Sequence, residues 1–401
     1  MKIAHRAAVV STVALVVALG LAGCGSVGSP QASPGSSSGG GSGGGSGPAT
    51  PTPTPTPTVD PIAGLTLEQR VGQLFMVGTT ASAAEPGTLN LIAQRHVGNV
   101  FLSGRSTIGV AATKAVTAKL RAQVSASSTH GIPLFISTDQ EGGEVQVLQG
   151  PGFSAMPTGL AQGGLSATAL AASSTTWGAQ LHAAGVNMDL GPVVDLVSSA
   201  TAAPKNPPIG AFQREFGFTA ATIVTHANAF RQGMTASNVV TVIKHFPGLG
   251  FVDKNTDTSA NVVDTVTGPD GVDVGIYKSE IAAGATCVMV SSATYKRIDA
   301  SSPGVFSHTM VTGLLRDQLG FTGLIVTDDL SGAKQVLSVT PGNRAIRAIE
   351  AGVDIVLVSK DPDVAAAMVD AVVAKAKTDP AFAAQVDTAA RRIVEAKRAQ
   401  L

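Results

Sequence analysis

Short apolar runs recur along the chain after residue 58, and longer alanine-rich segments separate them. The runs are continuous and lack the polar alternation of a half-exposed strand, which is typical of strands buried on both faces of a parallel sheet. They predict eight strands, at residues 74–77, 99–102, 134–137, 186–190, 239–243, 287–290, 324–326 and 355–358. Between them, segments such as residues 221–233 and 344–351 carry apolar residues three and four apart, which predicts helices.

Strands that alternate with helices predict an α/β fold with a parallel sheet. Because eight runs are present, and because residues 59–401 are long enough for one barrel with insertions, we expect a single (β/α)8 TIM barrel. A doubly wound open sheet is the structural alternative.

The first 58 residues follow another pattern. Lys2 and Arg6 precede an apolar run over residues 7–19, and Leu-Ala-Gly-Cys follows at residues 21–24. The run is shorter than the roughly 18 to 20 residues that span a membrane, so residues 1–24 predict a signal peptide. The last four residues resemble a bacterial lipobox, which implies that Cys24 carries a lipid. Residues 25–58 consist almost wholly of Gly, Ser, Pro, Ala and Thr and predict a disordered tether, which leaves residues 59–401 as the folded domain.

Charge and cysteine content narrow the possible partners. The chain has 27 basic and 27 acidic residues and no cluster of Lys and Arg, so a nucleic-acid-binding surface has no support. We expect membrane contact through the lipid anchor only, at the outer face of the cell membrane, and a monomer. With Cys24 acylated, Cys287 has no partner, and its apolar surroundings predict an inert core thiol. The histidines lack the spacing of a metal site and no nucleotide-binding loop is present, so no cofactor is expected.

Polar residues gather where the predicted strands end. Asp139 follows the third run, Asp189 and Asp195 the fourth, the pair Lys244 and His245 the fifth, and Asp328 and Asp329 the seventh. Each carboxylate alone could be a helix N-cap. The carboxyl ends of barrel strands meet at one face, however, so four strand ends that carry polar residues together predict a single site.

Three strings then carry a resemblance to a known family. They are STDQEGGEVQ at 137–146, KHFPGLG at 244–250 and LIVTDDLSG at 324–332, with NMDLGPVVDL at 187–196 and NPPIGAFQREFG at 206–217 in support. In this order they resemble the signature blocks of glycoside hydrolase family 3 over nearly all of residues 60–401. The domain is similar to the single-domain bacterial β-N-acetylhexosaminidases of that family. The resemblance implies hydrolysis of a terminal β-linked N-acetylglucosamine from cell-wall fragments or other glycans.

The resemblance also implies roles for individual residues. Family members use a retaining double displacement, and Asp328 matches their nucleophile. Asp139, Arg214, Lys244 and His245 match residues around the bound sugar. Some readings stay open: Arg214 could instead pair with Glu215 or a nearby loop acid, and Lys244 with His245 could be a buried structural pair. Asp195 could orient Lys244 or Arg214 or touch the sugar, and Asp329 is expected to be a cap or loop carboxylate.

The sequence departs from the family at the general acid. Relatives carry a second histidine where Leu249 stands, and an Asp-Ser-His whose histidine donates the proton, whereas residues 251–261 contain no histidine. Asp257 lies at about the expected position and is our candidate acid/base, with Asp253 as the less favoured one. A carboxylic acid can act in this way if its pKa is raised, although ordinary loop carboxylates stay ionised. A non-catalytic glycan-binding barrel and a phosphorylase with the same nucleophile are therefore the alternatives.

A second departure concerns the substrate. Glu144 and Val147 stand where relatives carry two arginines, so we expect the site to disfavour an anionic neighbouring sugar. Aromatic residues make up 4% of the chain, with one tryptophan, which argues against a long stacking cleft and favours a small pocket for a terminal sugar.

Overall fold

The computed structural model describes residues 60–401. The predicted signal peptide at residues 1–24, the lipidation site Cys24 and the tether at residues 25–58 lie outside the described residues, so these three predictions stay untested. Within residues 60–401, no helix is both long enough and apolar enough to cross a membrane.

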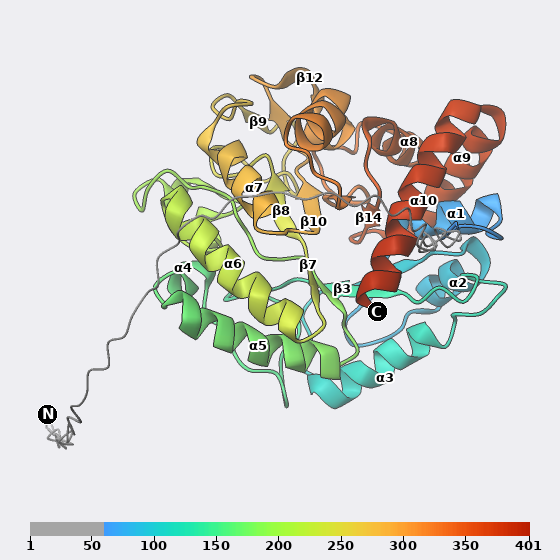
Figure 1. Ribbon diagram of the computed structural model, residues 1–401, viewed down its shortest axis with the longest axis horizontal. Coiled ribbons are helices and arrows are strands. Elements are labelled where there is room, and N and C mark those ends of the chain that lie inside the picture. Colours follow the sequence, from blue (N-terminus) through green and yellow to red (C-terminus); the bar gives the residue numbers. More distant parts are fainter. Residues whose placement is uncertain (1–59) are drawn as a thin grey trace, which may run out of the picture. The chain divides into compact units, whose positions relative to one another are not determined.

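Parallel strands form the centre of the domain and helices surround them (Figure 1). Six strands pair in the order β14-β1-β2-β3-β6-β7 and three in the order β13-β10-β8. Isolated parallel bridges join Val193 to Lys244 and Val326 to Ile355. The strands are β1 (Phe75–Thr80), β2 (Asn99–Ser103), β3 (Phe135–Thr138), β6 (Met188–Asp189), β7 (Val240–Thr241), β8 (Ile243–Phe246), β10 (Cys287–Val290), β13 (Leu324–Thr327) and β14 (Val356–Val358).

Helices follow most of these strands along the chain. Several begin at a side chain that accepts a backbone N–H, such as Ser166 before α5 and Thr219 before α6, because this satisfies a free donor of the first turn. The α-helices are α1 (Leu67–Gln73), α2 (Pro86–Arg95), α3 (Gly109–Arg121), α4 (Gly159–Gln162), α5 (Ala167–Ala183), α6 (Ala220–Ala236), α7 (Val272–Ala282), α8 (Pro341–Ala351), α9 (Ala365–Thr378) and α10 (Pro380–Gln400), and η4 (Thr309–Gln318) is a π-helix.

Short elements shape the loops above the strands. The antiparallel pairs are β4 (Gln140–Gly142) with β5 (Val145–Gln146) and β11 (Thr294–Tyr295) with β12 (Asp299–Pro303), and β9 (Val263–Asp264) runs parallel to β11. The short 3-10 helices are η1 (Ala203–Lys205), η2 (Gly210–Phe212), η3 (Gly304–Phe306) and η5 (Pro362–Val364).

Every predicted strand is confirmed to within a few residues, and the run at 239–243 corresponds to β7 and the start of β8. The predicted helices at residues 221–233 and 344–351 lie within α6 and α8. The α/β architecture with parallel strands is thus confirmed. Because the strands pair as sheets of six and three linked by isolated bridges, a complete (β/α)8 barrel stays a prediction.

The strands are apolar because side chains on both of their faces are buried, and the core holds Phe75, Ile136, Val288 and Ile325 with no exposed surface. Cys287 lies in this core as a free thiol, which confirms its predicted place in the core, and burial raises its pKa to about 12.

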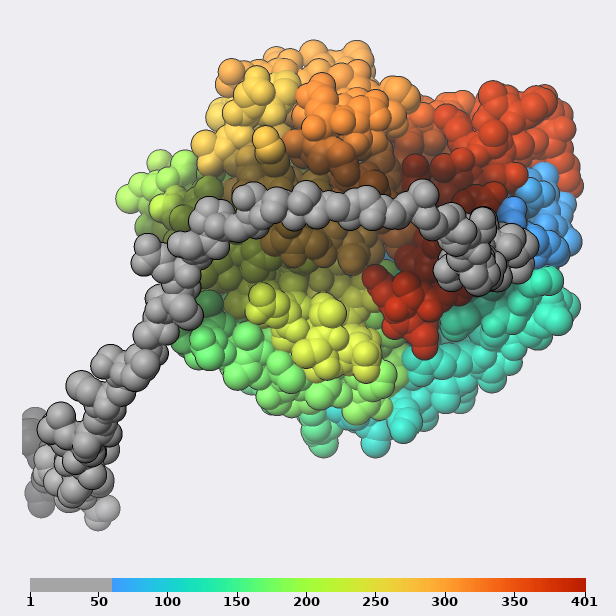
Figure 2. All heavy atoms as spheres, viewed as in Figure 1, coloured from blue at the N-terminus to red at the C-terminus, as the bar shows by residue number. Residues whose placement is uncertain are grey.

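The end of α10 lies across the amino ends of the strands. The buried ammonium of Lys397 is 2.8 Å from both the Gln73 side-chain oxygen and the Gly98 carbonyl, just before β2. In the space-filling view the end of α10 reaches the surface between α3 and α6 (Figure 2). The opposite ends of the strands are thus left free to form a site.

Candidate active site

A cavity of about 510 Å³ lies at the carboxyl ends of the strands. The residues that line it come from strands β2, β8, β10 and β14 and from the segments after β2, β3, β6, β8, β13 and β14, as the clustering of polar strand ends predicted. Of the residues predicted for the site, those that line this cavity are Asp139, Arg214, Lys244, His245, Asp257 and Asp328. Asp195 lies behind His245, and Asp253 is exposed and does not line the cavity.

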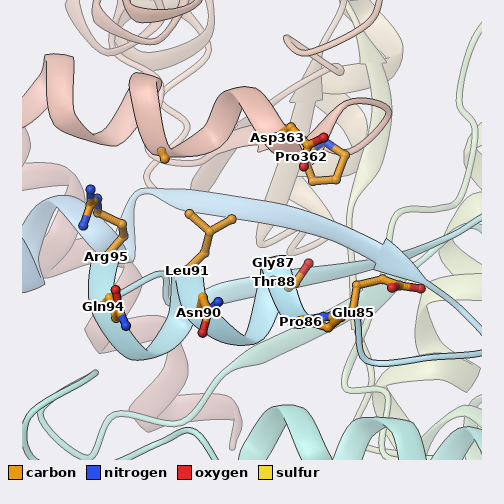
Figure 3. Close-up of a pocket in the computed structure, with 11 residues that line it drawn as sticks. Glu85, Pro86, Gly87, Thr88, Asn90, Leu91, Gln94, Arg95, Pro362 and Asp363 are labelled. Atoms are coloured by element: carbon orange, nitrogen blue, oxygen red, sulfur yellow. The ribbon is translucent and has the colours of Figure 1, made fainter.

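A second hollow of about 480 Å³ lies between α2 and the start of α9 (Figure 3). Thr88 and Leu91 of α2 face Pro362 and Asp363 across it. It contains none of the predicted site residues, so the chemistry of the molecule concentrates in the first cavity.

An ion network forms one wall of that cavity. The Lys244 ammonium is 2.7 Å from Asp139 Oδ1 and 2.6 Å from Glu141 Oε1. The Arg214 guanidinium donates two hydrogen bonds of 2.8 Å to the two carboxylate oxygens of Glu141. Arg214 therefore lines the cavity and also pairs with a nearby acid, and that acid is Glu141. Glu215 is not its partner: it is buried, and neither of its carboxylate oxygens has a hydrogen-bond partner among residues 60–401.

Opposite charges in the network favour the ionised forms of Glu141 and Lys244. Burial opposes the charge of Glu141, but Arg214 and Lys244 outweigh this effect and lower its pKa to about 2. Burial likewise opposes the charge of Lys244, but Asp139 and Glu141 raise its pKa. The two cations are thereby fixed as hydrogen-bond donors at the cavity wall.

Asp195 pairs with His245, and not with Lys244 or Arg214. Its Oδ2 is 2.8 Å from His245 Nδ1, and its Oδ1 accepts the backbone N–H groups of His245 and Leu249 at 3.1 and 2.8 Å. A carboxylate at Nδ1 places a proton on that nitrogen and fixes the ring orientation. Lys244 and His245 are both buried, yet they line the cavity, so they are more than a structural pair.

Asp189 lies at the end of β6 with no exposed surface. Its Oδ1 accepts the Gln140 N–H at 2.9 Å, while Oδ2 has no partner within residues 60–401. Burial raises its pKa to about 7. Burial therefore favours the protonated form of this carboxyl group more than in an exposed aspartate, a feature that no local sequence pattern indicates.

The two carboxyl groups predicted to act in catalysis line the same cavity. Asp328 directly follows β13, and its backbone N–H donates to the Val290 carbonyl at 3.0 Å. Burial and then the charge of Asp257 raise the pKa of Asp328 to about 6, while His245 opposes the shift. Asp257 is an exposed residue of its loop, but packing around its carboxyl group, followed by the charge of Asp329, raises its pKa.

Asp329 is confirmed as a loop carboxylate. It accepts hydrogen bonds from the N–H and hydroxyl of Ser331, the N–H of Gly332, the N–H and hydroxyl of Ser359 and the N–H of Lys360. These bonds tie the segment after β13, which carries Asp328, to the segment after β14.

Two cations at the cavity lie outside the motifs and were missed by the sequence reasoning. Arg105 follows β2 and donates to the backbone carbonyl of Glu144, and Lys360 follows β14. Neither makes a salt bridge within the described part of the chain. Arg105 therefore brings a positive charge next to Glu144. The motif alone indicated only a negative charge at this place.

Comparison with known proteins identifies relatives of this chain. The glycosyl hydrolase family 3 N-terminal domain matches residues 66–396. A β-hexosaminidase of Vibrio cholerae is 31% identical over 243 residues, which are 59% of this chain and 69% of that protein. An uncharacterized secreted glycosyl hydrolase of Arthroderma benhamiae is 28% identical over 339 residues, 83% of this chain and 94% of the other. The crystal structure of a β-N-acetylhexosaminidase from Beutenbergia cavernae superposes with a TM-score of 0.83 at 60% identity, covering 83% of this chain and 99% of that one.

Proposed function

The chain belongs to glycosyl hydrolase family 3, and on that premise we propose that it is an exo-acting, retaining β-N-acetylhexosaminidase with Asp328 as its nucleophile. The observation that carries this proposal is that Asp328 and Asp257 line one cavity with the charged network of Arg214 and Lys244. The β-hexosaminidases among its relatives support the activity. In this proposal the two parallel sheets are parts of one (β/α)8 barrel.

In the first step, the Asp328 carboxylate attacks the anomeric carbon and the bond to the leaving oxygen breaks. Asp257 gives its proton to that oxygen, so the leaving group departs as a neutral alcohol. The raised pKa of Asp257 supports this role, because a solvated aspartate would already have lost the proton. The products of the step are a glycosyl ester on Asp328 and an ionised Asp257.

In the second step, ionised Asp257 takes a proton from water, and the oxygen of that water attacks the anomeric carbon. The ester bond to Asp328 breaks, and the sugar leaves with its original β-configuration. The charge of Asp328 disfavours ionisation of Asp257, and esterification has meanwhile removed that charge. Asp257 therefore changes from acid in the first step to base in the second. Both carboxyl groups then return to their starting states.

The sugar is held by the ionised wall. Asp139 and Lys244 can accept from and donate to neighbouring hydroxyls, Arg214 provides further donors, and His245, with its proton on Nδ1, offers Nε2 as an acceptor. A cavity of about 510 Å³ suits one terminal sugar better than a long chain. The substrate is therefore a terminal β-linked N-acetylglucosamine on cell-wall fragments or other glycans, bound by a monomer.

The place of action follows from the amino-terminal residues. The secreted relative in Arthroderma benhamiae supports an extracellular location. Lipid attachment at Cys24 would hold the enzyme at the outer face of the membrane, with residues 25–58 as its tether.

The proposal is tested with 4-nitrophenyl N-acetyl-β-glucosaminide and with N,N′-diacetylchitobiose. An activated leaving group needs little protonation, so Asp328→Ala should abolish turnover of both substrates, while Asp257→Ala should mainly reduce kcat/KM for the disaccharide. Sugar binding without turnover by the unmutated chain would instead indicate a non-catalytic glycan-binding protein. Phosphate-dependent release of a sugar 1-phosphate would indicate a phosphorylase.

A further inference from the structure

Asn206 joins two loops of the active site that are far apart in sequence. It is 3% exposed and directly follows η1. Its side-chain oxygen accepts the N–H groups of Ile209 and Gly210 at 3.1 and 3.0 Å. Its side-chain nitrogen donates to the carbonyls of Leu249 and Val252 at 2.8 and 2.9 Å. The oxygen and the nitrogen of the Asn206 amide thus each bond to a different loop.

The first of these loops presents Arg214. The N–H of Ala211 donates to the Asn206 carbonyl at 3.0 Å, and the N–H of Arg214 donates to the Ile209 carbonyl at 3.2 Å. The Arg214 guanidinium also donates to the Pro208 carbonyl at 2.8 Å. The turn that begins at Asn206 therefore sets where the guanidinium enters the cavity.

The second loop presents Asp257. After its attachment at residues 249 and 252, it is held again by the segment that follows the nucleophile. The N–H groups of Gln335 and Lys334 donate to the carbonyls of Thr256 and Asp257 at 3.1 and 3.3 Å, and the Gln335 side chain accepts the Val262 N–H at 2.8 Å. The loop is thus fixed at its start by Asn206 and further along by the 334–335 segment.

We propose that Asn206 is a positioning residue that sets the acid/base carboxylate of Asp257 against Asp328 through its two bonds to Leu249 and Val252. The inference rests on the proposed function, because it takes Asp257 to be the group that protonates the leaving oxygen. A buried amide with four backbone partners is costly to disturb, since each lost bond leaves an unpaired polar group. It therefore gives the loop one defined position.

Asn206→Asp separates the two halves of this arrangement. The substituted carboxylate still accepts from Ile209 and Gly210, so the Arg214 turn is kept. It cannot donate to the carbonyls of Leu249 and Val252, and it repels them, so the start of the acid loop is released. Asn187→Asp is the matched control, because the Asn187 amide also accepts one backbone N–H and donates to one backbone carbonyl, at 2.7 and 3.0 Å, but stands before β6 at the other end of the strands.

The measurement is kcat/KM of the full chain for 4-nitrophenyl N-acetyl-β-glucosaminide and for N,N′-diacetylchitobiose, with the melting temperature of each variant. For Asn206→Asp we expect a fall of about 10- to 100-fold on the disaccharide, because a small misplacement of a catalytic group has effects of that order. On the activated substrate we expect a change within about 3-fold, because its leaving group needs little general acid. Asn187→Asp should change both values by the same factor.

Equal losses on the two substrates in Asn206→Asp, or the same pattern in Asn187→Asp, would overturn the inference. The proposed function fails separately: if Asp257→Ala itself shows no dependence on the leaving group, Asp257 is not the acid. If kcat/KM depends on the leaving group in Asp257→Ala but not in Asn206→Asp, Asp257 is still supported as the acid, and only the positioning role of Asn206 is refuted.

Discussion

Replacing Glu141 by Gln tests whether the ion network stabilises the domain. The carboxylate accepts two hydrogen bonds from Arg214 and lies 2.6 Å from the Lys244 ammonium, with 5% of its side chain exposed. In Glu141→Gln, Lys244 still pairs with Asp139, but Arg214 loses its carboxylate partner. It also turns an amide N–H₂ toward a cation.

The magnitude follows from the pKa of Glu141. The fall from the ordinary 4.5 to about 2, at about 1.4 kcal/mol per pKa unit, corresponds to about 3 kcal/mol of stability. Because the folded-state pKa is depressed, this contribution is fully present above pH 4.5 and is lost as the pH falls toward 2. Removing one partner of a buried ion pair costs about 3 to 5 kcal/mol, which agrees with the value from the pKa shift.

Urea unfolding of the wild type and of Glu141→Gln between pH 3 and pH 8 measures the effect. We expect a loss of about 3 kcal/mol at pH 7 that shrinks as the pH falls below 4.5. Glu280→Gln is the control, since Glu280 is also buried and is 2.9 Å from Arg231, but burial raises its pKa to about 7. Because the folded-state pKa of Glu280 is raised from 4.5 to about 7, its contribution to stability is present below about pH 4.5 and is lost as the pH rises to about 7, so Glu280→Gln should destabilise the protein less at pH 8 than Glu141→Gln does. A loss below about 1 kcal/mol in Glu141→Gln, or an equal loss in the control, would refute this reasoning.

Further predictions concern the catalytic carboxylates and the core thiol. Asp328 must be ionised to attack and burial raises its pKa to about 6, so kcat/KM for the nitrophenyl substrate should fall as the pH drops below about 6. A profile that stays flat well below pH 6 would contradict the raised pKa of Asp328. Asp329→Asn weakens six hydrogen bonds, three of which reach from its own loop to the loop after β14, so we expect a loss of about 1 to 3 kcal/mol in urea unfolding together with a lower kcat. Cys287 should resist thiol reagents in the folded protein, as peptide mapping can show, and rapid labelling without unfolding would contradict its burial.

The strands and their polar ends could be predicted because each depends on neighbouring residues in the sequence. A continuous apolar run identifies a doubly buried strand, and a charged residue directly after the run falls at the carboxyl end of that strand. Lys244, His245 and Asp328 were placed in this way, and all three line the cavity.

The pairing of charges could not be predicted, because it depends on how distant segments meet. Glu141 binds Arg214 across 73 positions of sequence, and Asp195 binds His245 across 50. The choice between Asp253 and Asp257 likewise depends on the docking of their loop against residues 334–335. Arg105 and Lys360 lie outside every motif, so only the fold brings them to the cavity.

In the proposed mechanism, Asp328 becomes covalently bonded to the sugar during turnover. A fluorinated N-acetylglucosaminyl substrate with an activated leaving group slows hydrolysis of the intermediate, and mass spectrometry of the intact chain and its peptides then locates the bond. We expect one added glycosyl group on the peptide that contains residues 324–332, at Asp328, and none in Asp328→Ala. A glycosyl group on another residue, or steady turnover with the sugar released in the inverted configuration, would contradict it.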